Sequence, residues 1–172
     1  HAIGRAADVQ IDFVKAVLLS NFRSGRLQEG ASTITQQLAR NLFLSSDKTV
    51  NRKLQELQLA FWLEARYSKE EILSLYLNRT YLGSGTFGVE AAANYYFSKS
   101  AKDLTLSEAS LLAGLPKAPS TLSPTSNYEG ASRRALEVID NLVETDVIDV
   151  ATAEIAKLNQ PELDVQNLNT EF

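Results

Sequence analysis

Apolar side chains recur at helical spacing along most of the chain, in segments separated by short polar or glycine-bearing stretches. The first segment, residues 12–22, is apolar on most sides and precedes a polar loop, which predicts a helix. It is too short to span a bilayer. It can be a core helix, or it can press an apolar face into a membrane interface, flanked by Lys15, Arg23 and Arg26. Apolar stripes are usually buried, so the core interpretation is favoured.

A second helix is predicted from a cap at Ser32 or Thr33 to about Leu44, because apolar residues recur on one stripe there. A third helix is predicted from a cap at Asp47 to Tyr67. Its apolar residues face more than one side, which predicts a central position in the fold. These residues are Leu54, Leu57, Phe61, Trp62 and Leu63.

Two capping boxes mark the starts of later helices. Ser68 and Glu71 open a helix over residues 69–78. Thr105 and Glu108 open another, which the following Gly-Leu-Pro sequence ends. The first of these two helices carries a run of apolar residues that we expect on its inner faces: Ile72, Leu73, Leu75, Tyr76 and Leu77.

The remaining segments add helices and loops but few strand signals. Residues 81–88 hold three glycines in a predicted turn that can line a cleft, and residues 89–97 resume a helical composition. The glycine spacing follows no strand, so a dinucleotide site is rejected. Residues 116–124 are expected to be extended, and two further helices are predicted, one from residue 129 onward and one over residues 149–158. The predicted fold is therefore mainly α.

Length and composition fit one globular domain over residues 1–172. The net charge is −4, so a broad basic footprint for nucleic acid is missing, and no nucleic-acid partner is expected. Cysteine is absent, which excludes disulfides and thiolate metal sites. The chain begins at His1 rather than Met and has no apolar run long enough to span a membrane. We therefore expect it to be a piece of a longer protein.

Two segments, residues 32–37 and 52–56, carry polar groups where a packed core would place apolar ones. Residues 52–56 place two cations, Arg52 and Lys53, beside Glu56 on one predicted helix. Because the chain as a whole is acidic, a polyphosphate would have to be bound by such a local cluster of cations. A threonine cap and an Arg/Glu pair at i, i+4 are common surface features, so each taken singly is more often structural. The first segment supplies hydroxyl and amide groups suited to sugar hydroxyls or phosphate oxygens: Ser32, Thr33, Thr35, Gln36 and Gln37.

The same segments, in the same order, resemble the peptidoglycan glycosyltransferase domain of class A penicillin-binding proteins and of monofunctional glycan polymerases. The likeness covers residues 13–148, with weaker matches at residues 81–93 and 133–139. Three segments are similar to the family's second, third and fourth motifs: Gly30-Ala-Ser-Thr-Ile-Thr-Gln-Gln37, Arg52-Lys-x-x-Glu56 and Lys69-x-x-Ile-Leu-x-x-Tyr-Leu-Asn78.

The resemblance implies a lysozyme-like helical lobe with a small membrane-facing subdomain, preceded in the full protein by a transmembrane anchor. It implies a place in the bacterial cell envelope, on the outer, periplasmic face of the cytoplasmic membrane. The donor would be a polyprenyl pyrophosphate-linked glycan, and the 4-hydroxyl of lipid II would attack its anomeric carbon. Moenomycin-type phosphoglycolipid inhibitors are implied as ligands. The sequence requires no cofactor and lacks metal-ligand spacing, and a divalent cation with the substrate pyrophosphate stays open.

The resemblance also implies a role for each motif residue. Arg52 and Lys53 would bind the donor pyrophosphate, and Lys69 would add charge nearby. Glu56 would be the second essential carboxylate, which orients substrate or assists the leaving group. The family's general base is a glutamate of its first motif, and no residue of this chain matches it, so impaired catalysis is expected. Polar contacts to sugar or phosphate would come from Ser32, Thr33, Gln36, Gln37 and Asn78.

Three other functions compete with this interpretation. One is a catalytically silent module that binds lipid II or glycan. Another is a lysozyme-like hydrolase with Glu56 as proton donor, which needs a second carboxylate about 5 to 9.5 Å away. The adjacent cations favour the ionised form of Glu56, which cannot donate a proton. The third is a purely structural helical adaptor, which would tolerate loss of the polar side chains.

Overall fold

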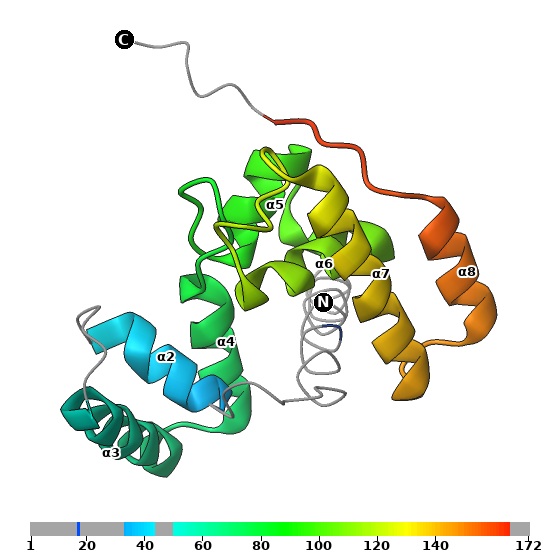
Figure 1. Ribbon diagram of the computed structural model, residues 1–172. Coiled ribbons are helices and arrows are strands. Elements are labelled where there is room, and N and C mark those ends of the chain that lie inside the picture. Colours follow the sequence, from blue (N-terminus) through cyan, green and yellow to red (C-terminus); the bar gives the residue numbers. More distant parts are fainter. Residues whose placement is uncertain (1–16, 18–32, 44–49, 166–172) are drawn as a thin grey trace, which may run out of the picture. The chain divides into compact units, whose positions relative to one another are not determined.

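The structure is a computed structural model that describes residue 17, residues 33–43 and residues 50–165 (Figure 1). Within this part of the chain, the regular structure is helical apart from one isolated antiparallel bridge between Tyr81 and Phe87. The prediction of a mainly α fold is therefore confirmed. The chain divides into two compact units, which are described separately.

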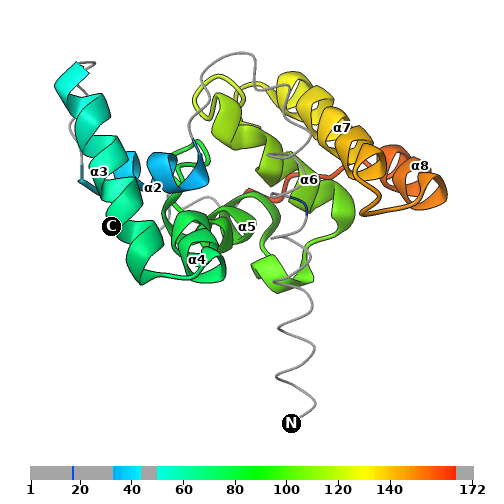
Figure 2. The same ribbon diagram turned by 90° about the horizontal axis from the view of Figure 1, so that it is seen from below.

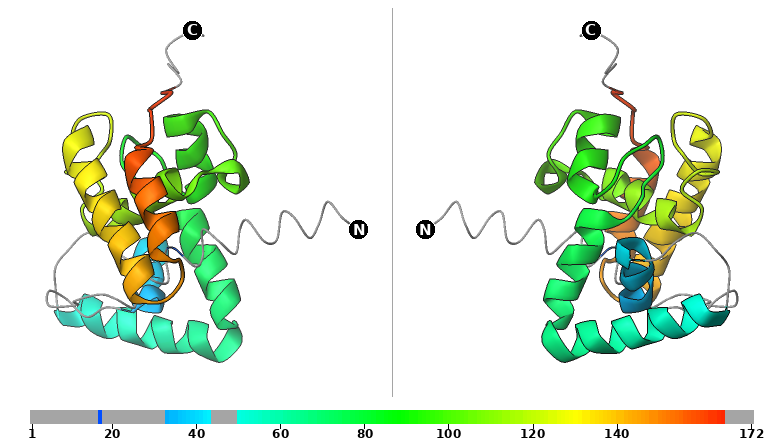
Figure 3. Two further views of the ribbon diagram at one scale, coloured as in Figure 1. Left: turned by 90° about the vertical axis from the view of Figure 1, so that its right-hand side faces the viewer. Right: turned by 90° about the vertical axis from the view of Figure 1, so that its left-hand side faces the viewer.

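The first compact unit spans residues 27–80, and its described helices are α2 Ile34–Phe43, α3 Val50–Arg66 and α4 Lys69–Arg79. α2 packs against both other helices, and α3 and α4 meet at a corner (Figure 3). The predicted cap of α2 is confirmed, because the Gln36 amide donates to Oγ1 of Thr33 at 3.2 Å. Buried apolar side chains come from all three helices: Leu38, Ala39, Ala60, Leu63, Ile72, Leu73, Tyr76 and Leu77.

The predicted central position of α3 is wrong. The buried side chains among its described residues are Glu56, Ala60 and Leu63, which recur at helical spacing on one face. Phe61 is 71% exposed and Trp62 45% exposed on the remaining surface, and Leu54 is exposed as well. An apolar run shows that a helix can bury several sides, but the neighbouring elements decide which sides are covered.

Smaller differences concern α4 and the segments before it. α4 ends at Arg79, one residue later than predicted, and Leu75 is exposed rather than buried, because it lies on the side of the helix opposite its packed face. Of the helix predicted over residues 12–22, the structure describes Val17, which is helical and buried. The predicted cap at Asp47 lies outside the described residues.

The second compact unit comprises residues 1–26 and 81–172, and it is built around α6. All residues of α6 from Ser107 to Gly114 are buried. The helix packs against α5, α7 and α8, and α7 and α8 form a helical hairpin beside it (Figure 2). The described elements of this unit are α5 Val89–Phe97, η1 Ala101–Asp103, α6 Leu106–Gly114, η2 Leu115–Lys117, α7 Tyr128–Glu144 and α8 Val150–Leu158.

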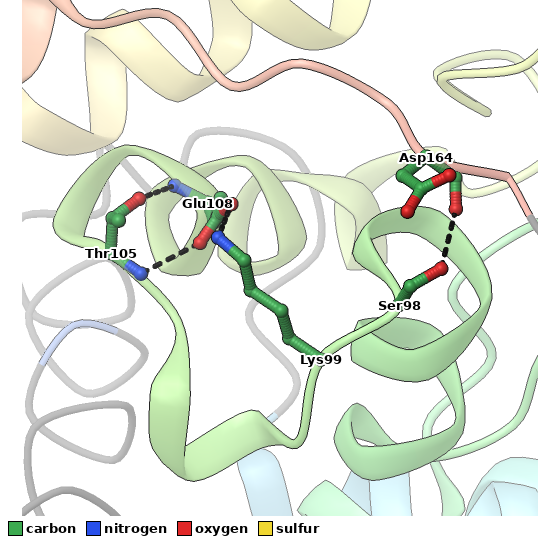
Figure 4. A network of polar contacts seen from close by, with 5 residues as sticks. All are labelled: Ser98, Lys99, Thr105, Glu108 and Asp164. Atoms are coloured by element: carbon green, nitrogen blue, oxygen red, sulfur yellow. Dashed lines mark hydrogen bonds and ion pairs between the residues drawn. The ribbon is translucent and has the colours of Figure 1, made fainter.

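Both predicted capping boxes are confirmed. The Glu71 carboxylate accepts from the Ser68 amide at 2.8 Å, which lowers the pKa of Glu71. In the second box the Thr105 amide donates to Glu108 at 2.8 Å (Figure 4). The other oxygen of the buried Glu108 carboxylate accepts from Lys99 at 2.7 Å. Both carboxylate oxygens of Glu108 therefore have hydrogen-bond partners, which accounts for the burial of this residue and indicates a structural role.

The segment over residues 116–124 was expected to be extended, and the structure shows consecutive turns instead. The 3₁₀ turn η2 follows α6 directly, and the Leu122 amide donates to the Ala118 carbonyl at 2.8 Å. Proline lacks an amide hydrogen and has a fixed φ, and it therefore fits the first positions of a tight turn as well as an extended chain. Beyond this segment, the side chain of Asn127 caps α7 by accepting from the Gly130 amide at 3.0 Å.

Candidate functional site

Arg52, Lys53 and Glu56 form an ion cluster on one face of α3. Nε of Arg52 lies 3.2 Å from Oε1 of Glu56, and Nζ of Lys53 lies 3.0 Å from Oε2. The spacings i, i+4 and i, i+3 bring these side chains together on a helix, so the local sequence alone places them side by side. We refer to these three residues as the α3 triad.

Within the α3 triad, the exposed fraction of the side chain increases from Glu56 to Arg52 to Lys53. The Glu56 side chain is 3% exposed, that of Arg52 is 19% exposed and that of Lys53 is 47% exposed. A carboxylate this deeply buried requires cationic partners, and here each carboxylate oxygen faces one cation. The arrangement presents the lysine to solvent, where an ammonium group can reach a phosphate oxygen.

A buried tyrosine of α4 forms a hydrogen bond with Gln37 of α2. The hydroxyl of Tyr76, a residue that is 1% exposed, donates to Oε1 of Gln37 at 3.4 Å. Burial raises the pKa of Tyr76, against the opposing effects of a hydrogen bond with Thr80 and the charge of Arg40. The phenol therefore keeps its proton and acts as a donor at neutral pH. Since the Gln37 side-chain oxygen accepts this hydrogen bond, the amide nitrogen is the donor end of the side chain.

Sequence analysis predicted Tyr76 only as a core residue and missed this contact. Because its neighbours on α4 are apolar, packing in the core was enough to account for a tyrosine at this position. A usable signal was that a tyrosine buried among leucines needs a polar partner for its hydroxyl. The partner lies 39 residues away in the sequence, so the identity of Gln37 as that partner required the folded chain.

The other predicted site residues that the structure describes lie on α2 and α4 or at the cap of α2. Thr33 is exposed and caps α2, which is the structural role that its sequence pattern also allowed. Asn78 is exposed and donates to the Ser74 carbonyl of its own helix at 2.9 Å. Lys69 is exposed at the first position of α4, and Gln36 is half-buried on α2. Ser32 lies outside the described residues.

The described residues include neither a cluster of metal ligands nor a membrane-spanning helix. No three His, Asp or Glu side chains gather there to hold a metal ion. A divalent cation that accompanies the substrate pyrophosphate thus stays a prediction. None of the described helices has the length and apolar character needed to cross a membrane.

Comparison with known proteins identifies relatives of the chain. A family model described as Transglycosylase matches residues 7–143. Penicillin-binding protein 1A of Neisseria gonorrhoeae is 48% identical over 137 residues, which cover 80% of this chain and 17% of the relative. The protein of the same name from Vibrio cholerae is 51% identical over 134 residues, which cover 78% of this chain and 16% of the relative.

A solved structure shares the fold. The crystal structure of penicillin-binding protein 1A from Haemophilus influenzae matches with a TM-score of 0.54 and 28% sequence identity, covering 82% of this chain and 18% of that chain. The match confirms the predicted lysozyme-like helical fold class. The chain spans less than a fifth of the length of these relatives.

Proposed function

We propose, since this chain belongs to the transglycosylase family, that it acts in peptidoglycan synthesis by transferring a lipid pyrophosphate-linked glycan to the 4-hydroxyl of lipid II. The family model covers residues 7–143 and so includes every motif residue. The observation that carries the proposal is the α3 triad, in which two cations flank a carboxylate that is 3% exposed. A purely structural surface pair would not require a buried carboxylate.

The proposed reaction forms one glycosidic bond and breaks one. The 4-hydroxyl oxygen of lipid II attacks the anomeric carbon of the donor, and the bond from that carbon to the pyrophosphate breaks. The hydroxyl proton passes to a general base, and the lipid pyrophosphate leaves with the electron pair. Arg52 and Lys53 offset the charge that grows on the leaving group, while Glu56 holds both cations in place.

A general base must complete this site, and the family resemblance assigns it to a motif for which the chain has no matching residue. We therefore propose that the chain binds substrate but polymerises poorly by itself. The test compares it with the same protein extended upstream of His1, using labelled lipid II and separation of glycan products by length. Polymerisation only by the extended protein supports the proposal. If the extended protein binds lipid II but makes no glycan, the alternative of a silent binding module is correct.

The geometry disfavours a lysozyme-like hydrolase. Both oxygens of Glu56 face cations, at 3.2 and 3.0 Å, and the side chain is 3% exposed. A glycosidase acid must instead reach the glycosidic oxygen that it protonates. Release of reducing sugar from finished glycan by the chain would contradict this assignment.

Tyr76→Phe is expected to weaken substrate binding without unfolding the protein. The variant removes the hydroxyl that orients Gln37 and leaves the buried ring in place. Loss of one hydrogen bond is worth about 0.5–1.5 kcal/mol, so we expect KM for lipid II to rise by about 2-fold to 13-fold with a smaller change in kcat. Steady-state kinetics of the upstream-extended protein measures both constants.

The matched control for Tyr76 is Tyr67→Phe, which also removes one phenolic hydroxyl from this unit but from a side chain that is 39% exposed. We expect its KM to stay at the wild-type value. Equal KM values for wild type and Tyr76→Phe would remove Tyr76 as a positioning residue.

We further propose that the exposed apolar face of α3 rests on the outer surface of the cytoplasmic membrane, where lipid II resides. Phe61 and Trp62 are 71% and 45% exposed, and the Arg66 guanidinium lies 4.9 Å from the centre of the Trp62 ring. Aromatic and cationic side chains on one helix are typical of interfacial binding. We expect moenomycin-type phosphoglycolipids, which combine a lipid with a phosphate, to bind at the α3 triad, where the donor pyrophosphate is proposed to bind.

Phe61→Ser is expected to reduce binding to anionic phospholipid vesicles about fivefold to thirtyfold. Insertion of a phenylalanine ring into an apolar phase is worth about 2 kcal/mol at most. Vesicle co-sedimentation over a lipid titration measures the change. Leu158→Ser alters a side chain that is 83% exposed on α8 and serves as the control, with unchanged binding expected. Equal losses in the two variants would argue against a specific α3 contact.

A further inference from the structure

Helix α8 is apolar on two opposite sides. Ala153 and Ala156 are buried, and they pack with Ile139 of the neighbouring helix α7 (Figure 1). Ile155 is 63% exposed and Leu158 is 83% exposed. Each of these two lies two residues beyond a buried alanine, a rotation of about 200° around the helix, so they lie on the opposite side. A helix that is apolar all round is typical of an element with neighbours on both sides.

The exposed apolar residues continue toward the start of the helix. Val150, at the first position of α8, is 64% exposed, and Val147 in the preceding turn is 42% exposed. We refer to Val147, Val150, Ile155 and Leu158 as the α8 apolar surface. Single exposed apolar residues are common and need no partner, whereas a group of them on one short segment is typical of an interaction site.

The position of this surface is fixed by contacts on the buried side of α8. Oγ of the buried Ser107 on α6 donates to the Ala156 carbonyl at 2.7 Å. The Asp149 carboxylate caps the helix by accepting from the Thr152 amide at 2.7 Å. These contacts and the packed alanines hold the helix without any contribution from Ile155 or Leu158. The α8 apolar surface is therefore a preformed surface rather than a loosely packed part of the core.

The net charge of the chain is concentrated around the α8 apolar surface. Residues 140–158 hold five carboxylates and one lysine, which gives a net charge of −4. This equals the net charge of the whole chain, so the rest of the sequence is neutral overall. The five carboxylates are all on exposed residues: Asp140, Glu144, Asp146, Asp149 and Glu154.

Pairing within the protein neutralises only part of this charge. Nζ of Lys157 lies 2.8 Å from Oδ1 of Asp140 and 3.1 Å from Oε1 of Glu154, and thereby links α7 to α8. One lysine cannot neutralise five carboxylates, so the helical hairpin of α7 and α8 keeps a negative potential around its exposed apolar residues.

This charge decides which occupant fits the α8 apolar surface. Membrane binding by an amphipathic helix is strengthened when cations meet anionic lipids, and here carboxylates would meet them. A second copy of the chain, docked through the same surface, would bring an equal negative charge against the first. A protein segment with apolar side chains on one side, flanked by lysine or arginine, matches both the apolar residues and the charge.

We propose that the α8 apolar surface docks a basic amphipathic helical segment of another protein. The apolar side of the partner would cover Ile155 and Leu158, while its cations would face carboxylates such as those of Glu144 and Glu154. The surface follows residue 143, where the match to the Transglycosylase model ends. The inference goes beyond the proposed glycosyl transfer and does not depend on it.

The test is titration of the whole chain into a fluorescently labelled helical peptide of leucine and lysine with all leucines on one side, followed by anisotropy. We expect saturable binding, and we expect Ile155→Ser combined with Leu158→Ser to weaken it at least about tenfold, because two apolar contacts are lost. Both side chains are exposed, so the melting temperature should stay at the wild-type value. Phe87→Ser alters a side chain that is 62% exposed in the same unit, and this control should bind as wild type.

A second pair of variants tests the charge. Glu144→Gln combined with Glu154→Gln should weaken binding about twofold to thirtyfold and should reduce its dependence on salt, because two exposed ion pairs with the peptide are lost. Glu64→Gln combined with Asp103→Asn removes the same charge from exposed residues on α3 and η1. This control should keep the wild-type affinity.

Three results would overturn the inference. The first is absence of peptide binding, and the second is equal weakening in the Ile155/Leu158 variant and in Phe87→Ser. The third is binding of anionic phospholipid vesicles that the Ile155/Leu158 variant loses, which would assign the surface to a membrane. The same variant, in the upstream-extended protein, should polymerise glycan at the wild-type rate. Failure of this docking surface and failure of the proposed polymerase function are therefore distinguishable.

Discussion

Glu56→Gln should lower glycan polymerisation about a hundredfold or more in the upstream-extended protein, while the helical fold persists. The substitution keeps the shape of the side chain and removes its charge. Arg52 and Lys53 then lose the group that holds them 3.2 and 3.0 Å from its oxygens, and they no longer meet the leaving pyrophosphate in one geometry. Loss of preorganised charge of this kind costs about 2.7–4 kcal/mol of transition-state stabilisation. Initial rates of polymerisation from labelled lipid II measure the effect.

The same variant also tests what the α3 triad does for stability. Lys53 is 47% exposed and can regain water, whereas Arg52 is 19% exposed and loses much of its electrostatic partner. We expect the free energy of unfolding to fall by about 1–3 kcal/mol, which leaves the protein folded. Circular dichroism and denaturant titration measure this separately from activity.

Glu64→Gln is the matched control, since Glu64 lies on the same helix and is exposed. It should polymerise at the wild-type rate. Full activity in Glu56→Gln would remove Glu56 from the mechanism, and equal losses in both variants would show that the charge of α3 as a whole matters rather than this ion cluster.

Gly83→Ala should destabilise the protein by about 2–4 kcal/mol. Gly83 has φ 85°, and a left-handed conformation costs a residue with a Cβ about 1–2 kcal/mol. The added Cβ would also lie 2.7 Å from the Pro119 carbonyl oxygen and 3.0 Å from the Tyr96 hydroxyl. Relief of this overlap requires the backbones to separate, which adds about 1–2 kcal/mol. Denaturant unfolding of the purified chain measures the total.

Gly85→Ala separates the two causes. Gly85 has φ 75°, but a Cβ atom there would meet nothing within 4 Å. Only the conformational cost of about 1–2 kcal/mol should remain. A smaller loss in Gly85→Ala than in Gly83→Ala would confirm the close backbone contact, and equal losses would contradict it.

Local interactions made much of the fold predictable. Both capping boxes, the Thr33 cap and the starts of α4 and α6 follow from residues three positions apart. The α3 triad was predictable for the same reason, because helical geometry brings i, i+3 and i, i+4 side chains together wherever the helix lies. Each of these features depends on residues that lie within one or two helical turns of one another in the sequence.

The exposed surface of α3, the hydrogen bond from Tyr76 to Gln37 and the hydroxyl contacts of Ser84 with Ser123 and Thr125 were not predictable in this way. Each depends on contacts between segments distant in the sequence, such as the 39 residues between Tyr76 and Gln37 or between Ser84 and Ser123. Periodicity states that a helix has an apolar side, but not which neighbour covers it or which side faces water.

The sequence by itself therefore determined the helices, their caps, the ion cluster on α3 and the family to which these motifs point. Helical hydrogen bonding and neighbouring side chains on one helix are local, so these features do not require knowledge of the rest of the chain. Only the tertiary structure decided which groups are buried or exposed, as Glu56 and Phe61 show on the same helix. Burial arises from packing between elements, and close packing of distant segments is a property of the folded chain alone.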